Sequence, residues 1–195
     1  MSVMQINRPQ PRQQRPDNAK LVFQGGIFSA YQWEQKLYDG RTALYEQLTR
    51  PDSACVLAVT SEDKILITRQ LQPAVHEEFV GLPGGIIDPG EDPLAAAQRE
   101  LREETGYTAD NWQLWYSLQP AGRIDWACFV FVAFEARPTE AIHLDGGEQI
   151  SLDLVAVPEF MSALKKPDFR DTDVVVEVLR DPERFEQMLR TKKVQ

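Results

Sequence analysis

Short apolar segments separated by turn signals follow one another along most of the chain after Leu21. Runs of this kind, rich in β-branched and aromatic residues, predict strands rather than helices. The predicted strands span residues 21–23, 27–33, 42–48, 54–59, 64–68, 112–118, 126–136 and 150–155. Gly25-Gly26 and Ser61-Glu62-Asp63 each separate two neighbouring strands and therefore predict hairpins.

Three other segments predict helices. Asp92 followed by Pro93 is typical of a helix N-terminus and Gly106 of a C-terminus, so the first helix is expected to run to about Thr105. The other two are predicted at residues 158–164 and 172–189, with a break at Pro182. Because strands and helices do not alternate in regular βαβ units, the pattern predicts an α/β (α+β) fold built on a mixed sheet.

The start of the chain differs from the rest. It is rich in Gln, Arg and Pro and has almost nothing to bury, which is typical of a disordered segment. We therefore predict three parts, namely a disordered tail at 1–19, N-terminal strands at 20–50 and a main domain at 51–195.

Composition narrows the classes of function. The 195 residues carry a formal net charge of −9, which argues against a protein that coats nucleic acid, because such proteins present a basic face. No apolar run approaches the ~20 residues of a membrane helix, and the N-terminus lacks the apolar core of a secretion signal. We expect no membrane association and a cytoplasmic location. Cys55 and Cys128 lie in apolar runs, where small buried side chains are expected rather than a disulfide.

The candidate chemistry lies on the first predicted helix. Glu100, Glu103 and Glu104 stand at i, i+3 and i+4, a spacing that places three like charges on one helical face. These charges repel one another, and a divalent cation would offset the repulsion. The cluster contains no Cys or His, which favours Mg²⁺, or Mn²⁺, over Zn²⁺. For an isolated pair of glutamates, the alternative is an acidic face that is simply solvated.

This helix is part of a longer pattern. Its fixed positions are Gly85, Glu91, Arg99, Glu100, Leu101, Glu103, Glu104, Gly106 and Tyr107. At each of them the segment resembles the Nudix box of the Nudix hydrolase family. The resemblance implies a Nudix-type mixed-sheet α/β/α sandwich, here with an extra N-terminal antiparallel strand pair. It also implies hydrolysis of a nucleoside diphosphate that is linked to another group.

The same resemblance assigns roles within the box. The Mg²⁺ ligands that it implies are the side chains of Glu100, Glu103 and Glu104 and the backbone carbonyl of Gly84. Arg99 and Glu91 would hold the loop and orient these glutamates. The bound metal would draw charge from the diphosphate and lower the pKa of a water that attacks phosphorus, so that Glu103 and Glu104 take part in catalysis.

Outside the box, the chain resembles the ADP-ribose and nucleotide-sugar pyrophosphatase branch. Residues 69–75 resemble its Arg-Gln-Tyr-Arg-Pro-Ala stretch, and Pro120-Ala121-Gly122 resembles its Pro-Gly turn. Gly147-Glu148-Gln149-Ile150 resembles a late acidic loop whose glutamate acts as general base or as an additional metal ligand. By this resemblance Glu148 is the candidate base, and Asp145 is the alternative in the same loop.

Members of this branch often exchange N-terminal strands in a homodimer and build the base pocket from both chains. The implied substrate-binding residues are Phe28 and Tyr45 to stack on the base, Glu46 for a base amino group, Arg50 for a phosphate, and Arg69. Aromatic residues in strands also serve as plain packing partners, the role that we expect for Trp33. The expected partners are thus a nucleoside diphosphate-linked small molecule and a second copy of the chain, with no nucleic acid.

Two departures from the branch bear on the substrate. Gln72 replaces the second Arg of the Arg-Gln-Tyr-Arg stretch, and Gly81 replaces a glutamate before the box. We predict Mg²⁺-dependent hydrolysis of ADP-ribose or a related nucleoside diphosphate sugar to a nucleoside monophosphate and a sugar phosphate. The alternatives are a Nudix hydrolase of triphosphates, dinucleotides or RNA caps, and a nucleotide-binding module without catalysis. His76 and His143 are expected to be loop residues.

Overall fold

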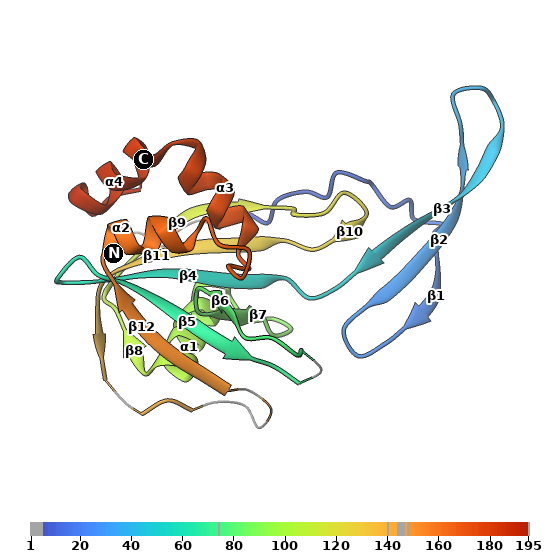
Figure 1. Ribbon diagram of the computed structural model, residues 1–195. Helices are drawn as coiled ribbons and strands as arrows, with labels where there is room; N and C mark the ends of the chain where they lie inside the picture. The colour runs from blue at the N-terminus through green and yellow to red at the C-terminus, as the bar shows by residue number, and fades with distance from the viewer. Residues whose placement is uncertain (1–5, 74, 140, 144–146, 148, 195) are drawn as a thin grey trace.

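The computed structural model describes residues 6–73, 75–139, 141–143, 147 and 149–194. Within these residues, the chain forms a main body of sheet and helices and an arm that projects from one end of it (Figure 1). The strands of the body are β4 (Ser53–Thr60), β5 (Ile65–Leu71), β6 (Phe79–Gly81), β7 (Gly84–Ile86), β8 (Tyr107–Thr108), β9 (Asn111–Leu118), β11 (Cys128–Pro138) and β12 (Gln149–Val155). Its helices are α1 (Pro93–Thr105), α2 (Val157–Ala163), α3 (Thr172–Arg180) and α4 (Pro182–Thr191). The arm contains β1 (Lys20–Gln24), β2 (Ser29–Lys36) and β3 (Thr42–Thr49), joined by β10 (Ile124–Asp125).

The body sheet is mixed and has β4 and β11 at its centre. Its order is β12-β5-β4-β11-β8, with β6 beside β5, β7 beside β4 and β9 beside β11. β11 runs parallel to β4 and antiparallel to β9. Both central strands are buried along most of their length, as expected for strands that are covered on both faces.

Two hydrophobic cores lie on opposite faces of this sheet, because successive side chains of a strand point to opposite sides. On one face Val56 packs in a cluster with Leu101 of α1. On the other face Leu57 packs in a cluster with Phe160 of α2 and Phe185 of α4. The body is therefore an α/β/α sandwich on a mixed sheet, which confirms the predicted fold class. None of the described helices combines the length and the apolar character needed to cross a membrane.

The arm is an antiparallel sheet with the order β1-β2-β3-β10. Trp33 on β2 is opposite Tyr45 on β3, and their ring centroids are 6.1 Å apart. β10 pairs with the end of β3 in parallel and comes from the body just before β11, so it ties the arm to the body. The predicted N-terminal hairpin is present, and β3 extends it to three consecutive strands.

The segment before β1 differs from its prediction. The sequence predicts a disordered tail, but residues 6–19 pack against both the body and the arm. The Arg8 guanidinium donates to both carboxylate oxygens of Asp52, at 2.7 and 2.9 Å, and to Asp125, at 2.7 Å. Gln47 Nε2 donates to a carbonyl of the tail at 2.7 Å. Composition could not predict this packing, because the partners lie far away in the sequence and the segment needs no apolar core of its own.

Removal of the Arg8 side chain tests whether these contacts anchor the tail. We expect Arg8→Ala to lower the free energy of unfolding by about 0.5–1 kcal/mol, a modest value because the ion pairs are partly exposed to solvent. Urea unfolding measures the change, and Arg12→Ala is the matched control because Arg12 is an exposed residue of the same tail. Equal stability of the two variants would show that Arg8 does not anchor the segment.

Candidate active site

Helix α1 presents the candidate acidic residues, and its ends are those that the sequence predicts. Asp92 accepts hydrogen bonds from the backbone nitrogens of Leu94, at 2.9 Å, and Ala95, at 3.3 Å, as an N-cap does. The helix ends at Gly106, whose φ of 71° is in the left-handed region that favours glycine. The caps define both ends of α1, and the packing of Ala97 and Leu101 in the core fixes which face of the helix turns toward the sheet.

Two of the three glutamates lie against the backbone of β7. Glu104 is buried, and its Oε2 accepts a hydrogen bond from the backbone nitrogen of Gly84 at 3.0 Å. The carboxylate of Glu100 lies so close to Gly85 that a side chain at this position would collide with it. Because Gly85 has no side chain, the Glu100 carboxylate can approach the backbone of β7.

Arg99 holds Glu103, the third glutamate, and the loop between β7 and α1. Its guanidinium donates to both oxygens of Glu91 at 2.9 Å, to the carbonyl of Ile86 at 2.9 Å, to Glu100 at 2.7 Å and to Glu103 at 3.3 Å. Hydrogen bonds from Arg99 lower the pKa of Glu91, and those same bonds raise the pKa of Arg99. The structure thus brings together Arg99, Glu91 and the glutamates of α1, as the resemblance implied.

Arg99 and the three glutamates of α1 line a cavity of about 610 Å³. Its lining residues are Arg50, Gln72, Gly84, Gly85, Ile86, Asp88, Arg99, Glu100, Glu103, Glu104 and His143. A volume of this size is within the ~300–1,000 Å³ typical of small-molecule sites. The sequence did not single out His143 as a site residue, yet it lines the cavity and its backbone nitrogen donates to the carbonyl of Glu103 at 2.9 Å.

The donors at this cavity fit a hard divalent cation. Three carboxylates and the backbone of β7 offer only oxygen ligands, the type that Mg²⁺ and Mn²⁺ prefer. Among the described residues, no three acidic, Cys or His side chains already surround a common point. Arg99 donates hydrogen bonds to Glu100 and Glu103, and the Gly84 backbone nitrogen donates one to Glu104, so each carboxylate already has a hydrogen-bond donor beside it.

Arg50 also lines this cavity and lies close to two aromatic rings. Its guanidinium is 4.5 Å from the ring centroid of Trp126 and 5.9 Å from that of Phe28. Burial lowers the pKa of Arg50, and its buried Nε finds no hydrogen-bond partner within the described parts of the chain. A buried donor without a partner carries an energetic cost that an anionic ligand would relieve.

Arg69 does not reach this cavity, although the sequence placed it among the substrate-binding residues. Side chains alternate along β5, so Arg69 lies on the face opposite Gln70, while Gln72 reaches the cavity lining. The Arg69 guanidinium instead donates to Asp153 of β12 at 2.6 Å. It lines a separate hollow together with His76.

The other candidates for the base pocket lie on the arm. The ring of Tyr45 is 5.7 Å from the guanidinium of Arg123, and Glu46 accepts a hydrogen bond from Gln32 at 2.6 Å. Neither residue lines the cavity beside α1. Phe28 does not line it either, but its ring lies near the guanidinium of Arg50, which does. The candidate bases Glu148 and Asp145 lie outside the described residues.

A second cavity, of about 410 Å³, adjoins the first and shares Arg50 and the three residues of β7 with it. Three residues that the sequence did not single out line it, namely Trp126, Asp171 and Asp173. The only sequence signal at Asp171 was its place before a predicted helix, which is typical of a structural N-cap.

Cys55 and Cys128 line this second cavity, and burial controls their reactivity. Burial raises the pKa of Cys128 to about 11 and that of Cys55 well above its usual value. At pH 8 only roughly a thousandth of Cys128 is then thiolate, the reactive form. We expect Ellman's reagent to modify the native thiols at least about 100-fold more slowly than free cysteine, and faster as the pH rises. Both thiols should react promptly in guanidinium chloride, and fast reaction of the native protein at pH 8 would contradict this environment.

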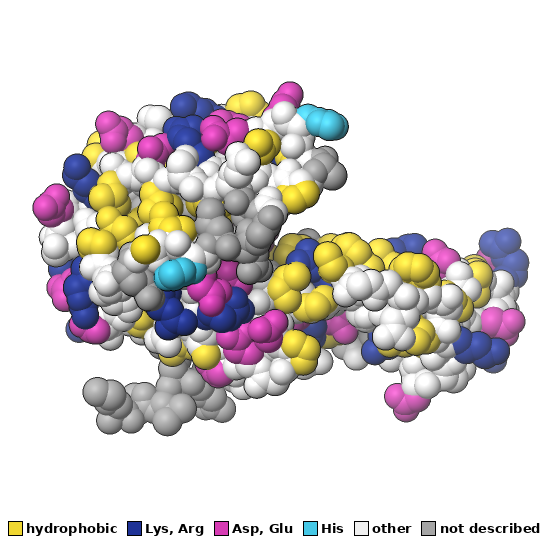
Figure 2. Space-filling view, turned by 90° about the horizontal axis from the view of Figure 1, so that it is seen from below, with side chains coloured by type: hydrophobic (Ala, Val, Ile, Leu, Met, Phe, Trp, Pro, Cys, Tyr) yellow, Lys and Arg dark blue, Asp and Glu magenta, His cyan; other side chains and the backbone are white. Residues whose placement is uncertain are grey.

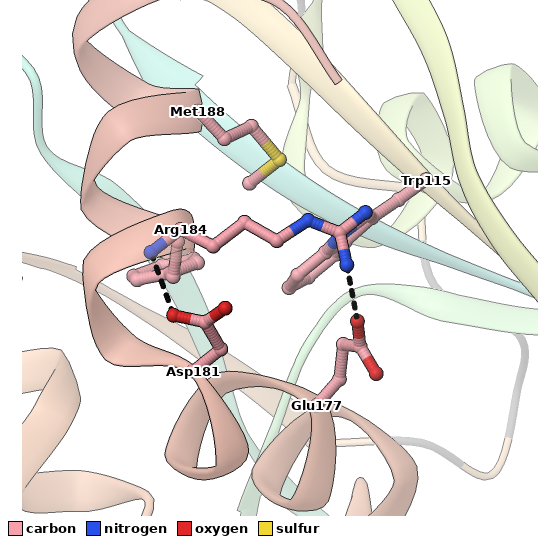
Figure 3. Close-up of a pocket in the computed structure, with 6 residues that line it drawn as sticks. Trp115, Glu177, Asp181, Arg184 and Met188 are labelled. Carbon is pink, nitrogen blue, oxygen red and sulfur yellow. Dashed lines mark hydrogen bonds and ion pairs between the residues drawn. The ribbon is translucent and has the colours of Figure 1, made fainter. Parts of the chain in front are cut away.

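A small hollow between α3 and α4 has a structural role (Figure 3). Its volume of about 10 Å³ has room for about one water molecule. The backbone nitrogen of Arg184 donates to Asp181 at 3.0 Å, and the Arg184 guanidinium is 3.7 Å from Glu177. These contacts join the two helices where Pro182 separates them.

Comparisons with known proteins agree with this geometry. The family described as NUDIX domain matches residues 49–176. The chain is 29% identical over 160 residues to the methanol dehydrogenase activator of Bacillus methanolicus, covering 80% of this chain and 86% of that protein. It is 38% identical over 88 residues to the ADP-ribose pyrophosphatase of Bacillus subtilis, covering 45% and 48% of the two chains. A crystal structure of an ADP compounds hydrolase shares the fold, with a TM-score of 0.72 and 21% identity over 94% of this chain and 98% of that one.

Proposed function

Since this chain belongs to the NUDIX domain family, we propose that it is a hydrolase that cleaves the diphosphate bridge of ADP-ribose or a related nucleoside diphosphate sugar. The products would be a nucleoside monophosphate and a sugar phosphate. The names of similar proteins, which include an ADP-ribose pyrophosphatase and an ADP compounds hydrolase, support this class of substrate.

One observation carries the proposal. The carboxylates of Glu100, Glu103 and Glu104 and the guanidinium of Arg50 line a single cavity. The carboxylates offer oxygen ligands to a cation, and the Arg50 side chain offers a positive charge with an unused donor to a phosphate. A cavity that provides both is suited to a diphosphate that is bound together with a divalent metal.

We assign the residues as follows. Glu100, Glu103, Glu104 and the carbonyl of Gly84 would hold Mg²⁺ or Mn²⁺. The metal, when bound, would neutralise charge on the diphosphate and lower the pKa of the attacking water. Arg99 is a positioning residue, because it fixes Glu100 and Glu103 relative to the loop.

Outside the box, we assign two further roles. Arg50 would bind a phosphate, and Phe28, with its ring partly exposed beside Arg50, would stack on the base. Glu148, or Asp145 in its place, would accept a proton from the attacking water. The expected site of action is the cytoplasm.

A substrate panel tests the proposed reaction. The purified chain is incubated with ADP-ribose, ADP-glucose, a dinucleotide and ATP, each with Mg²⁺ and with EDTA, and the products are identified by mass spectrometry. We expect AMP and a sugar phosphate from the first two compounds, with no turnover in EDTA. Preferential cleavage of ATP, or binding of ADP-ribose without any product, would overturn the proposal.

We also propose that the arm pairs with a second copy of the chain. Hydrophobic side chains gather on the arm in the view of Figure 2. The large hydrophobic residues that are exposed on the arm are Leu21, Val22, Phe23, Ile27, Phe28, Tyr38, Leu44 and Leu48. Exposed apolar side chains that gather in one part of a soluble protein often mark an interaction site.

Light scattering tests this assembly. For the wild type we expect a molecular mass twice the 22.2 kDa of one chain. For Leu44→Glu, which places a charge on the arm, we expect a shift toward the mass of a single chain. Leu154→Glu is the matched control, because Leu154 is an exposed leucine of the body. A wild-type protein that is monomeric at all concentrations would contradict the proposed pairing.

A further inference from the structure

The second cavity lies between the starts of β4 and β11 and the N-terminus of α3. It is continuous with the cavity of the box glutamates through Arg50, Gly84, Gly85 and Ile86, which line both. A ligand whose phosphates lie beside Arg50 could therefore extend into it. Its volume of about 410 Å³ is large enough for one ring and its substituents.

Asp171 forms one wall of this cavity in an unusual way. It occupies the N-cap position of α3, yet its side chain makes no capping hydrogen bond to that helix. Instead, Oδ2 accepts a hydrogen bond from the backbone nitrogen of Leu82 at 2.7 Å, and it is 2.9 Å from where a Cβ on Gly81 would lie. Burial raises the pKa of Asp171 to about 6. The fold thus directs this carboxylate toward the cavity lining and away from its own helix.

Asp173 adds a second carboxylate in the first turn of the same helix. It is partly buried, and burial raises its pKa. Its side chain forms no hydrogen bond or ion pair within the described residues. A carboxylate that has lost part of its hydration without gaining a partner is free to accept hydrogen bonds from a ligand.

The remaining walls favour a hydroxylated ring over a nucleobase. The Arg50 guanidinium, 4.5 Å from the Trp126 ring centroid, already covers one face of this ring. The indole nitrogen of Trp126 donates to Ser53 at 3.0 Å, so the ring offers the cavity an apolar surface. The carboxylate of Asp173, unpaired among the described residues, the second carboxylate oxygen of Asp171, nearby guanidinium donors and one apolar wall match a sugar, whose hydroxyls both donate and accept hydrogen bonds.

We propose that this second cavity binds the sugar on the far side of the diphosphate, with Asp171 and Asp173 accepting hydrogen bonds from its hydroxyls and Trp126 contacting its ring. This inference rests on the proposed function. It adds that these residues recognise the sugar part of the substrate. Arg50, whose guanidinium lies near both Phe28 and Trp126, would then mark the position of the diphosphate, with the base beside Phe28.

The experiment compares two substrates of the same reaction. ADP-ribose and the β-methyl ester of ADP contain the same adenosine and the same diphosphate bridge, but only ADP-ribose has the second sugar. We expect Asp173→Asn to lower kcat/KM for ADP-ribose by about 10-fold, the usual effect of losing a hydrogen bond to a charged group, and to leave kcat/KM for the methyl ester within about 2-fold. Asp171→Asn should act in the same direction, and thermal unfolding verifies that both variants fold.

Asp110→Asn is the matched control, because Asp110 is an exposed aspartate paired with Arg137 on the surface. Equal losses for the two substrates in Asp173→Asn and Asp171→Asn would place a part common to both, such as the adenosine, in the cavity and overturn the inference. No loss for either substrate would also overturn it. If the wild-type chain cleaves neither compound, the proposed function itself fails and the inference fails with it.

Discussion

Replacing Glu104 with Gln is expected to lower kcat for diphosphate hydrolysis by roughly 1,000-fold or more. Metal-ion catalysis supplies several kcal/mol of transition-state stabilisation, and each ~1.4 kcal/mol corresponds to a tenfold change in rate. The substitution removes the charge of a buried carboxylate that we propose as one of three metal ligands, and it keeps the shape of the side chain. The amide oxygen can still accept the hydrogen bond from the Gly84 nitrogen, so the fold should survive.

Steady-state kinetics and a thermal unfolding curve separate these two effects. The matched control is Glu62→Gln, since Glu62 is an exposed residue in the turn between β4 and β5 and should retain full activity. A folded Glu104→Gln protein with activity near that of the control would remove Glu104 from the metal site.

Arg99→Lys is expected to have the largest effect on stability, about 2 kcal/mol in the free energy of unfolding. The planar guanidinium bonds at once to both oxygens of Glu91 and to the Ile86 carbonyl, and a lysine ammonium cannot reproduce this geometry. The pair is mostly buried, with side-chain exposures of 24% for Arg99 and 18% for Glu91, so solvent screens it only partly. Because the loop then loses its anchor, kcat should also fall.

Urea unfolding and the kinetic assay are the measurements, with Arg137→Lys as control. Arg137 pairs with Asp110 on the surface, where replacing the guanidinium by an ammonium group should lower the free energy of unfolding by less than about 0.5 kcal/mol. If the two variants were equally stable, Arg99 would contribute no more to the fold than a surface ion pair.

Features set by neighbours in the sequence were predictable. The capping residues at Asp92 and Gly106 located both ends of α1 because a helix ends where its own backbone groups find local partners. The proline at 182 correctly predicted the break between α3 and α4. The short strands β6, β7, β8 and β10 were not predicted, since each has only two or three residues and β7, β8 and β10 pair with strands that are distant in the sequence.

The candidate site was predictable only in part. The spacing of the box placed the three glutamates on one side of α1, and the structure puts them at one cavity. The face on which Arg69 lies depends on the register of β5, which a resemblance between segments does not supply. Gly81 suggested a missing carboxylate before the box, but only the fold shows that Asp171, 90 positions later, lies against it.

The most direct test of the account is a crystal structure of the protein with Mn²⁺ and a non-hydrolysable analogue of ADP-ribose. The anomalous signal of manganese locates the metal independently of the fitted side chains. We expect a peak at about 2.1 Å from carboxylate oxygens of Glu100, Glu103 or Glu104, with the diphosphate of the analogue beside Arg50. A peak at another place in the fold, or a bound analogue with no metal at these glutamates, would contradict the central claim.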